Sequence, residues 1–229
     1  MVEAEFGFKN INFIFKLLIL DMKRKKDFLY SFIKRSLDFL LASFLFLVFV
    51  PLFLFISIII RWDSKGPVFY TPIRTGLFNK KFKMFKFRTM YLGSDNGADT
   101  TSKFDKRITS SGYFLRKFKI DEIPQLINII KGEMSFIGPR PELPRYTDKY
   151  NKEEKNILSV IPGITDYSSI YYSKFNEEVD EEDPDGYFER NILSYKNKLR
   201  LKYVFERNLL VDLSIFFRTI ITVVTNQFR

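Results

Sequence analysis

The stretch RKFKIDEIPQLINIIKGEMSFIGPRPE, residues 116–142, decides how we interpret the rest of the chain. It carries two adjacent carboxylates, Asp121 and Glu122, ahead of apolar residues that share one helical face: Ile123, Leu126, Ile127 and Ile130. Pro124 suits a first helical turn, and Gly132 is a natural residue just after a helix. The pattern predicts a short helix that starts with the carboxylate pair and ends at Gly132.

Basic residues lie on both sides of this carboxylate pair: Arg116, Lys117 and Lys119 precede it, and Arg140 follows it. Pro139 and Pro141 enclose Arg140, and their fixed φ angles restrict the backbone that carries it. We expect nearby cations to keep both carboxylates ionised at neutral pH. Such a pair suits magnesium binding or nucleophilic attack next to a phosphate. On spacing alone, the alternative is a surface helix with an acidic first turn.

The composition narrows the chemistry that the protein can use. The 229 residues include no cysteine and no histidine, which excludes thiolate, zinc–thiolate and histidine-based catalysis. The net charge of +10 predicts anionic partners such as phosphates, anionic lipids or nucleic acid. The length fits one domain with attached membrane elements.

The long apolar run FLLASFLFLVFVPLFLFISIII, residues 39–60, predicts a membrane segment. As a straight helix its 22 residues would reach about 33 Å, enough to span a bilayer. However, Pro51 interrupts the run, and basic residues flank both of its ends. We therefore expect a re-entrant helix over residues 34–62 that turns at Pro51 and leaves the membrane on the side it entered.

The remaining segments are assigned more simply. Residues 1–33 form an N-terminal extension, read either as an interfacial amphipathic helix or as a poorly ordered segment. Residues 66–90 predict a strand–turn–strand hairpin with a bulge or bend at Met84–Phe85, where the alternation of polar and apolar residues changes phase. An apolar stripe from Leu209 to Val224 predicts a helix that is either part of the core or packed at the membrane plane.

Four ordered blocks give the chain a family resemblance: KFKMFKFRTM, LRKFKIDEIPQL, KGEMSFIGPRPE and PGIT. They resemble the bacterial sugar transferases, the monotopic phosphoglycosyl transferases, over roughly residues 34–225. The resemblance implies transfer of a sugar 1-phosphate from a UDP-sugar to polyprenol (undecaprenyl) phosphate, with release of UMP. It also implies the first membrane step of a surface glycan or glycoprotein pathway, at the cytoplasmic face of the bacterial inner membrane.

The resemblance also implies a role for each candidate residue. Asp121 is the catalytic nucleophile that forms a covalent phosphosugar intermediate, and Glu122 holds Mg²⁺, with Asp121 as a second metal ligand. The expected substrate- and phosphate-binding residues are Lys86, Arg88, Arg116, Pro139 and Arg140. A Pro-broken re-entrant helix belongs to the same family pattern.

The resemblance implies an α+β fold. Residues 63–229 form a small, mostly helical catalytic domain with a short β-hairpin and a C-terminal interfacial helix. The chain departs from the family pattern at Val50, at Ile161 before the PG pair, and at Asp166-Tyr167, where many relatives carry Gly-Trp.

Two other functions compete with this one. A membrane-tethered basic module would bind nucleic acid or anionic lipid through basic residues interleaved with Phe. It does not explain the carboxylate pair, which would repel a phosphodiester backbone, so we expect no nucleic-acid partner. A metal-dependent phosphatase would use the same pair with water as the acceptor. The sequence leaves open the sugar, the pathway and whether the chain forms homo-oligomers.

Overall fold

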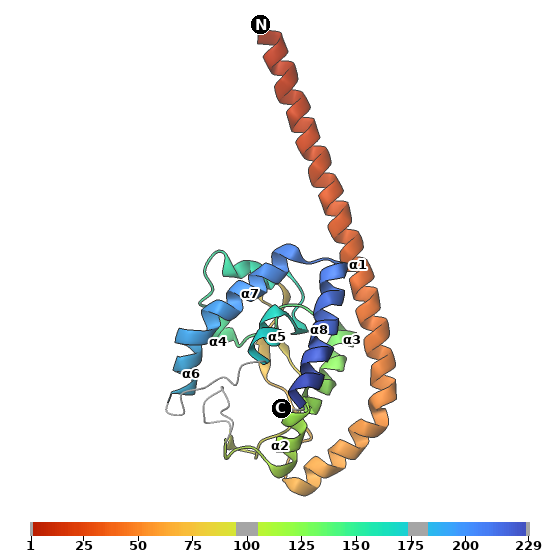
Figure 1. Cartoon of the computed structure of the whole chain (residues 1–229), viewed down its shortest axis with the longest axis vertical. Helices are drawn as coiled ribbons and strands as arrows, with labels where there is room; N and C mark the ends of the chain where they lie inside the picture. Colours follow the sequence, from red (N-terminus) through yellow and green to blue (C-terminus); the bar gives the residue numbers. More distant parts are fainter. Residues whose placement is uncertain (1, 95–104, 174–182, 228–229) are drawn as a thin grey trace. The chain divides into compact units, whose positions relative to one another are not determined.

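A computed structural model gives the structure of the chain, and it describes residues 2–94, 105–173 and 183–227 (Figure 1). The chain divides into two units, residues 1–37 and 38–229. The first unit consists of the beginning of helix α1, which runs over Val2–Asp63. The second unit holds the rest of α1 and all other elements. It is an α+β domain, mostly helical with a few short strands, and this agrees with the predicted fold class.

In the second unit, α1 packs one side against the domain and leaves the other side exposed. Ala42, Ile56 and Ile60 are buried in apolar clusters. Large apolar side chains on the opposite side are exposed, among them Phe39, Leu40, Phe44, Leu47, Leu54, Phe55 and Ile58. Within the described residues, Asp27–Asp63 is the one helical segment that has the length and apolar composition of a membrane span, and its most apolar 18-residue window has a mean hydropathy of 2.9.

Helix α1 continues through Pro51 without leaving helical geometry. Figure 1 shows the helix bending in its orange, C-terminal part, without reversing its direction. A proline inside a helix removes one backbone hydrogen bond and favours such a bend. The re-entrant path through a membrane stays a prediction.

The predicted hairpin forms, and it breaks at the predicted position. Strand β2 (Ile73–Thr75) pairs antiparallel with β3 (Lys81–Lys83), and β1 (Phe69–Tyr70) pairs antiparallel with β4 (Lys86–Phe87). The 3-10 helix η1 (Leu77–Asn79) forms the turn. Between the two pairs, the Met84 N–H donates to the Pro72 carbonyl at 2.9 Å. The break therefore separates the hairpin into two small sheets.

The carboxylate pair lies between two helices. Helix α2 (Ser110–Lys117) begins after Thr109, whose hydroxyl accepts a hydrogen bond from the Gly112 N–H. The six-residue 3-10 helix η3 (Ile120–Gln125) follows and carries the pair, and α3 (Leu126–Lys131) completes the segment. The sequence predicted a single helix, but the first turn is 3-10. The predicted end is confirmed, since Gly132 adopts a φ of 83°.

A parallel strand pair places the loop that contains Arg140. Strand β5 (Ser135–Ile137) pairs with β6 (Gly163–Thr165), with Ser135 opposite Gly163 and Ile137 opposite Thr165. The backbones approach so closely after β5 that a Cβ on Gly163 would lie 2.1 Å from the Gly138 nitrogen. Only glycine fits this contact. Helix α4 (Pro144–Thr147) and the 3-10 helix η4 (Glu154–Ser159) connect the two strands.

The C-terminal part of the chain is helical. Its helices are α5 (Tyr167–Ser173), α6 (Pro184–Tyr187), the π-helix η5 (Phe188–Ile192), α7 (Leu193–Glu206) and α8 (Leu209–Gln227). Of these, α5, α7 and α8 contact the strand pair. The Tyr203 hydroxyl on α7 bonds to the Ile137 carbonyl and to Asp212 on α8, which ties both helices to β5. Helix α8 buries Ile215 but exposes many apolar side chains, including Leu210, Leu213, Phe217 and Ile221.

Candidate active site

Glu122 is the centre of a cluster of charged side chains. Lys86 Nζ donates to Glu122 Oε1 at 2.9 Å. The Arg140 guanidinium forms a two-pronged contact with the same carboxylate: Nη1 donates to Oε2 at 3.1 Å, and Nη2 donates to Oε1. This fork is the geometry in which arginine binds carboxylates and phosphates most strongly. The structure thus brings together three of the residues predicted from the sequence.

Backbone contacts hold the loop that carries Arg140. The Gly138 N–H donates to the Thr165 carbonyl at 3.0 Å, and the Gly163 N–H donates to the Pro139 carbonyl at 3.1 Å. Pro139 therefore anchors the loop to β6 through its carbonyl. The Arg140 guanidinium also donates to the Ile164 carbonyl at 3.0 Å. The position of the Arg140 side chain is thereby fixed before any substrate binds.

Asp121 has a different environment from its neighbour. Its side chain is buried, with 7% exposed, and Oδ1 has no hydrogen-bond partner in the part of the chain that the structure describes. Burial, and then the negative charge of Glu122, raise the pKa of Asp121 above its usual value. The nearby cations Lys86, Lys119 and Arg116 favour the charged form of Asp121, as we expected, but burial and Glu122 outweigh them. Lys86 and Arg140 form their hydrogen bonds with Glu122 instead.

Glu122 shows the opposite shift. Burial alone would raise its pKa, but the charges of Arg140 and Lys86 outweigh burial and hold the pKa well below its usual range. Glu122 in turn raises the pKa of Arg140. The two adjacent carboxylates therefore differ, because one is paired and the other is not. Adjacent carboxyl groups whose pKa values are driven apart are a common feature of active sites.

Arg116 lies beside this cluster. Its Nε donates to the Thr89 hydroxyl at 2.8 Å. Burial lowers the pKa of Arg116, while the negative charge of Asp121 acts in the opposite direction. The predicted neighbourhood of Arg116 and Asp121 is present, but no direct hydrogen bond between them occurs in this structure.

Arg88 does not join the cluster. It is buried and donates to the Ser64 carbonyl at 2.7 Å and to the Lys65 carbonyl at 2.5 Å, just beyond the end of α1. We had placed it with Lys86 on the strand face nearest the site. Strand β4 ends at Phe87, so the alternation that would put Arg88 on the face of Lys86 stops there. The structure gives Arg88 the role of capping α1.

The carboxylate pair fits a magnesium ion that arrives with a phosphate. No cluster of three or more Asp or Glu side chains occurs among the described residues. Magnesium commonly takes one or two carboxylates together with substrate phosphates and water. Asp121 Oδ1 offers a buried oxygen that has no partner in the described parts of the chain. Both oxygens of Glu122 accept hydrogen bonds from cations, so Asp121 is the more available ligand.

Sequence reasoning missed two buried amides next to the site. Asn128 accepts from the Phe85 N–H at 2.9 Å and donates to the Lys83 carbonyl at 2.7 Å, which joins α3 to the hairpin. Gln125 is fully buried, and neither polar atom of its side-chain amide has a partner within the described residues. Asn128 interrupts the apolar run from Leu126 to Ile130, and that interruption was the available signal.

The sequence of this chain is similar to those of several known proteins. The family described as "Bacterial sugar transferase" matches residues 29–226. The chain is 34% identical to the UDP-N-acetylgalactosamine-undecaprenyl-phosphate N-acetylgalactosaminephosphotransferase of Aeromonas hydrophila, over 86% of this chain and 45% of that protein. It is 34% identical to the undecaprenyl-phosphate glucose phosphotransferase of Komagataeibacter xylinus, over 82% of this chain and 35% of that protein.

The chain matches most of the length of one shorter relative. The exopolysaccharide production protein ExoY of Rhizobium meliloti (strain 1021) is 36% identical over 82% of this chain and 83% of its own length. By contrast, the chain spans less than half the length of the Aeromonas and Komagataeibacter proteins. The family match extends over nearly the whole chain and includes every residue of the charged cluster. The chain belongs to the bacterial sugar transferase family.

Proposed function

We propose that the protein transfers a sugar 1-phosphate from a UDP-sugar to polyprenol (undecaprenyl) phosphate and releases UMP. The observation that carries the proposal is the difference between the two adjacent carboxylates: Arg140 and Lys86 hold Glu122, while one oxygen of buried Asp121 has no partner among the described residues. The names of the relatives support the substrate classes, since they include undecaprenyl-phosphate transferases for N-acetylgalactosamine and glucose.

The proposed reaction has two displacement steps at one phosphorus. A carboxylate oxygen of Asp121 attacks the sugar-bearing phosphorus of the UDP-sugar, and the bond to the UMP oxygen breaks, which leaves an acyl phosphate on Asp121. An oxygen of polyprenol phosphate then attacks the same phosphorus. The acyl–phosphate bond breaks, and Asp121 regains its carboxylate. No protein group has to donate a proton to UMP, because the departing phosphate is already a stable anion.

The cations of the cluster hold the substrate phosphates in this proposal. Arg140 offers a fork of N–H groups that matches phosphate oxygens, and Lys86 adds a second positive charge. Arg116 supplies positive charge beside Asp121. Magnesium held by Asp121 or Glu122 together with the diphosphate would neutralise charge on the phosphates and on the leaving UMP.

Two mechanisms compete with the covalent route. In the first, the lipid phosphate attacks the UDP-sugar directly and Asp121 is only a metal ligand. In the second, water is the acceptor and the enzyme is a phosphatase. The covalent route allows UMP release and a phosphosugar adduct before any lipid is present, whereas direct transfer allows neither. Hydrolysis would give continuous UMP and free sugar phosphate without lipid.

Rapid-quench mass spectrometry separates these outcomes. Purified enzyme, magnesium and a series of UDP-sugars are mixed without lipid, and UMP and the mass of the peptide that contains Asp121 are followed. We expect about one UMP per enzyme and an adduct equal to one sugar phosphate, with Asp121→Asn as the blank. A preparation that turns over with polyprenol phosphate but gives neither signal without it contradicts the covalent mechanism. The UDP-sugar that gives the burst identifies the sugar.

We further propose that the domain works at the cytoplasmic face of the bacterial inner membrane. The exposed apolar sides of α1 and α8, and Trp62 with 86% exposure, support this placement. The chain contains no cysteine, so single cysteines at Lys34 and Lys65 report topology cleanly. For a re-entrant helix, neither cysteine reacts with an impermeant thiol reagent in intact cells. Labelling of either one shows that the helix spans the membrane.

A further inference from the structure

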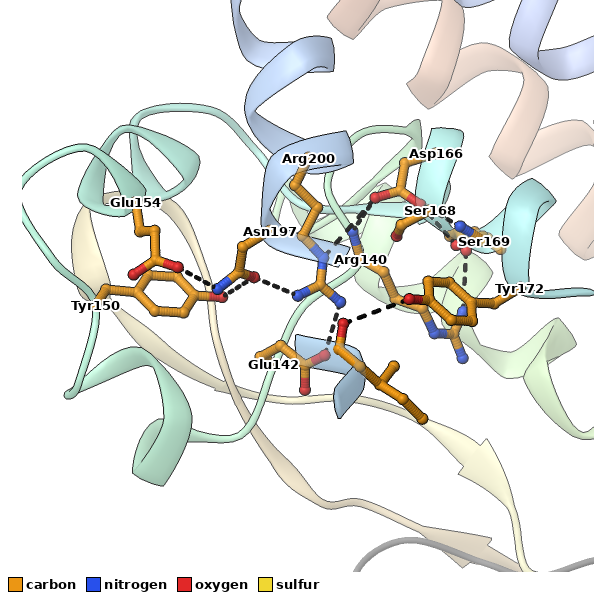
Figure 2. A network of polar contacts seen from close by, with 12 residues as sticks. Arg140, Glu142, Tyr150, Glu154, Asp166, Ser168, Ser169, Tyr172, Asn197 and Arg200 are labelled. Atoms are coloured by element: carbon orange, nitrogen blue, oxygen red, sulfur yellow. Dashed lines mark hydrogen bonds and ion pairs between the residues drawn. The ribbon is translucent and has the colours of Figure 1, made fainter. Parts of the chain in front are cut away.

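A second charged cluster contacts the loop that carries Arg140 (Figure 2). Its centre is Arg200 on α7, which is fully buried with 1% exposed. Arg200 Nη2 donates to Glu142 Oε1 at 2.6 Å, and Nη1 donates to Asn197 Oδ1 at 3.0 Å. Its Nε lies 3.9 Å from Asp166 Oδ2. A buried cation of this size requires partners, and both of its charged partners belong to segments next to Arg140.

Asp166 connects Arg200 to the backbone of Arg140. It is fully buried, and Oδ2 accepts a hydrogen bond from the Arg140 N–H at 3.2 Å. The other oxygen, Oδ1, accepts from the Ser169 N–H at 2.7 Å and from the Ser168 and Ser169 hydroxyls, which caps α5. Asp166 is also a position where this sequence departs from the family pattern. Asp166, where this sequence differs from the family pattern, thus holds the loop that carries Arg140, the residue proposed to bind phosphate.

Glu142 connects Arg200 to the other side of Arg140. It lies two residues further along the chain, and its backbone carbonyl accepts from the Thr75 N–H of β2 at 3.0 Å. Its carboxylate binds Arg200. Groups that interact with Arg200 therefore hold the loop on both sides of Arg140: Asp166 holds the Arg140 N–H, and Glu142 fixes the chain just after Pro141.

We propose that Arg200 is a positioning residue for Arg140. Arg200 holds Asp166 and Glu142 in place, and these two fix the backbone from which the Arg140 guanidinium reaches Glu122 and, by the proposed function on which this inference rests, the substrate phosphate. Arg200 itself does not touch the reacting groups. A small displacement of a phosphate-binding group reduces the rate even when the group itself is intact.

The test is a double-mutant cycle between Arg200 and Arg140, read as kcat/KM for UMP release in the presence of lipid acceptor. The four proteins are wild type, Arg200→Met, Arg140→Lys and the double variant, assayed well below the melting temperature of each. We expect Arg200→Met to reduce kcat/KM about ten- to a hundredfold in the wild-type background. In the Arg140→Lys background we expect the same substitution to reduce it less than about threefold, because a lysine no longer uses the fixed fork.

The melting temperature is the second measurement and separates positioning from stability. Arg200→Met should lower the melting temperature by a similar amount in both backgrounds. Its effect on kcat/KM, by contrast, should be large in the wild-type background and less than about threefold in the Arg140→Lys background. Arg190→Met is the matched control, since Arg190 forms an exposed ion pair with Asp183 on the neighbouring helical segment. We expect Arg190→Met to leave kcat/KM unchanged in both the wild-type and the Arg140→Lys background.

Glu142→Gln replaces Arg200→Met in the cycle if the methionine variant does not fold, because glutamine keeps an acceptor for Arg200 but removes the charge. Equal fold-losses in the two backgrounds overturn the inference, and so does wild-type kcat/KM in folded Arg140→Lys. Failure of the proposed function is distinct, since the wild-type protein would then release no UMP from any UDP-sugar. If the wild-type protein is active but the two substitutions act independently, the proposed function is retained and only the role of Arg200 is rejected.

Discussion

The two arginine–carboxylate clusters use the same chemical groups in different ways. The Arg140 side chain is 32% exposed and binds one glutamate, whose neighbour Asp121 keeps an oxygen without a partner among the described residues. The Arg200 side chain is 1% exposed and donates hydrogen bonds to Glu142 and Asn197, while its Nε lies 3.9 Å from Asp166 Oδ2 without a hydrogen bond. The comparison teaches that the cluster suited to chemistry combines an accessible cation with a carboxylate oxygen that is free to react, whereas the closed cluster buries its cation against carboxylates that hold the backbone.

The largest expected effect tests the unpaired group. Asp121→Asn removes the proposed nucleophile, so we expect kcat to fall by roughly a thousandfold or more. Stability should be unchanged or slightly higher, because burial raises the pKa of Asp121 and its ionised form is therefore disfavoured in the folded protein. UMP release and thermal unfolding in detergent measure the two effects. A variant that loses activity and several degrees of melting temperature together would instead make Asp121 a structural residue.

A smaller effect is expected at the accessible arginine. Charge-assisted pairs are worth roughly 1.5–3 kcal/mol, so Arg140→Ala should reduce kcat/KM about ten- to a hundredfold. Arg140→Lys should restore only part of the loss, because lysine keeps the charge but lacks the fork. Steady-state UMP release measures both variants. If folded Arg140→Ala retains wild-type kinetics, the accessible cluster has no role in phosphate binding.

Glu122→Gln should have a milder effect at saturating magnesium, a loss of about two- to tenfold in kcat. Glutamine keeps an acceptor oxygen for Lys86 and Arg140. It removes one of the two negative charges that Asp121 and Glu122 together offer to a cation. The clearest sign is a higher magnesium concentration for half-maximal rate. Glu142→Asp provides a matched carboxylate change in the closed cluster, and it should leave the magnesium dependence unaltered. Equal magnesium dependence in wild type and Glu122→Gln excludes Glu122 as a metal ligand.

The smallest effect on rate is expected at Arg88. Arg88→Met removes two hydrogen bonds to the carbonyls at the end of α1, which should cost about 2–4 kcal/mol of unfolding free energy. The kcat/KM of the folded protein should change less than about twofold, by contrast with Arg116→Met, which removes positive charge beside Asp121. Activity of the folded fraction and thermal unfolding of both variants provide the comparison. A tenfold loss of kcat/KM in stable Arg88→Met would place Arg88 in the site.

Local sequence signals predicted several boundaries around the site correctly. The change of phase at Met84–Phe85 located the break in the hairpin, and Gly132 located the end of α3. The spacing of prolines around Arg140 predicted a restricted loop, and the structure anchors that loop to β6. These features depend on neighbouring residues, so the sequence contains the information needed to predict them.

Features that depend on distant contacts were not predictable in the same way. Arg88 shares an alternating pattern with Lys86, but its partners lie about two dozen residues upstream at the end of a helix. The pKa of Asp121 depends first on its burial and then on the charge of Glu122. The sequence shows neither this burial nor that Lys86 and Arg140 form their hydrogen bonds with Glu122. The role of Asp166 depends on Arg140 and Arg200, which lie on different elements.

The parallel pairing of β5 with β6 has a consequence for how the protein is made. Arg140 takes its final position only when Asp166, and then Arg200, have left the ribosome, because both hold its loop. The apolar part of α1 is synthesised long before either residue. Parallel pairing and distant contacts also form slowly. We therefore expect the nascent chain to engage the membrane before its active site is complete, so that the enzyme first becomes active at the surface where the proposed lipid acceptor lies.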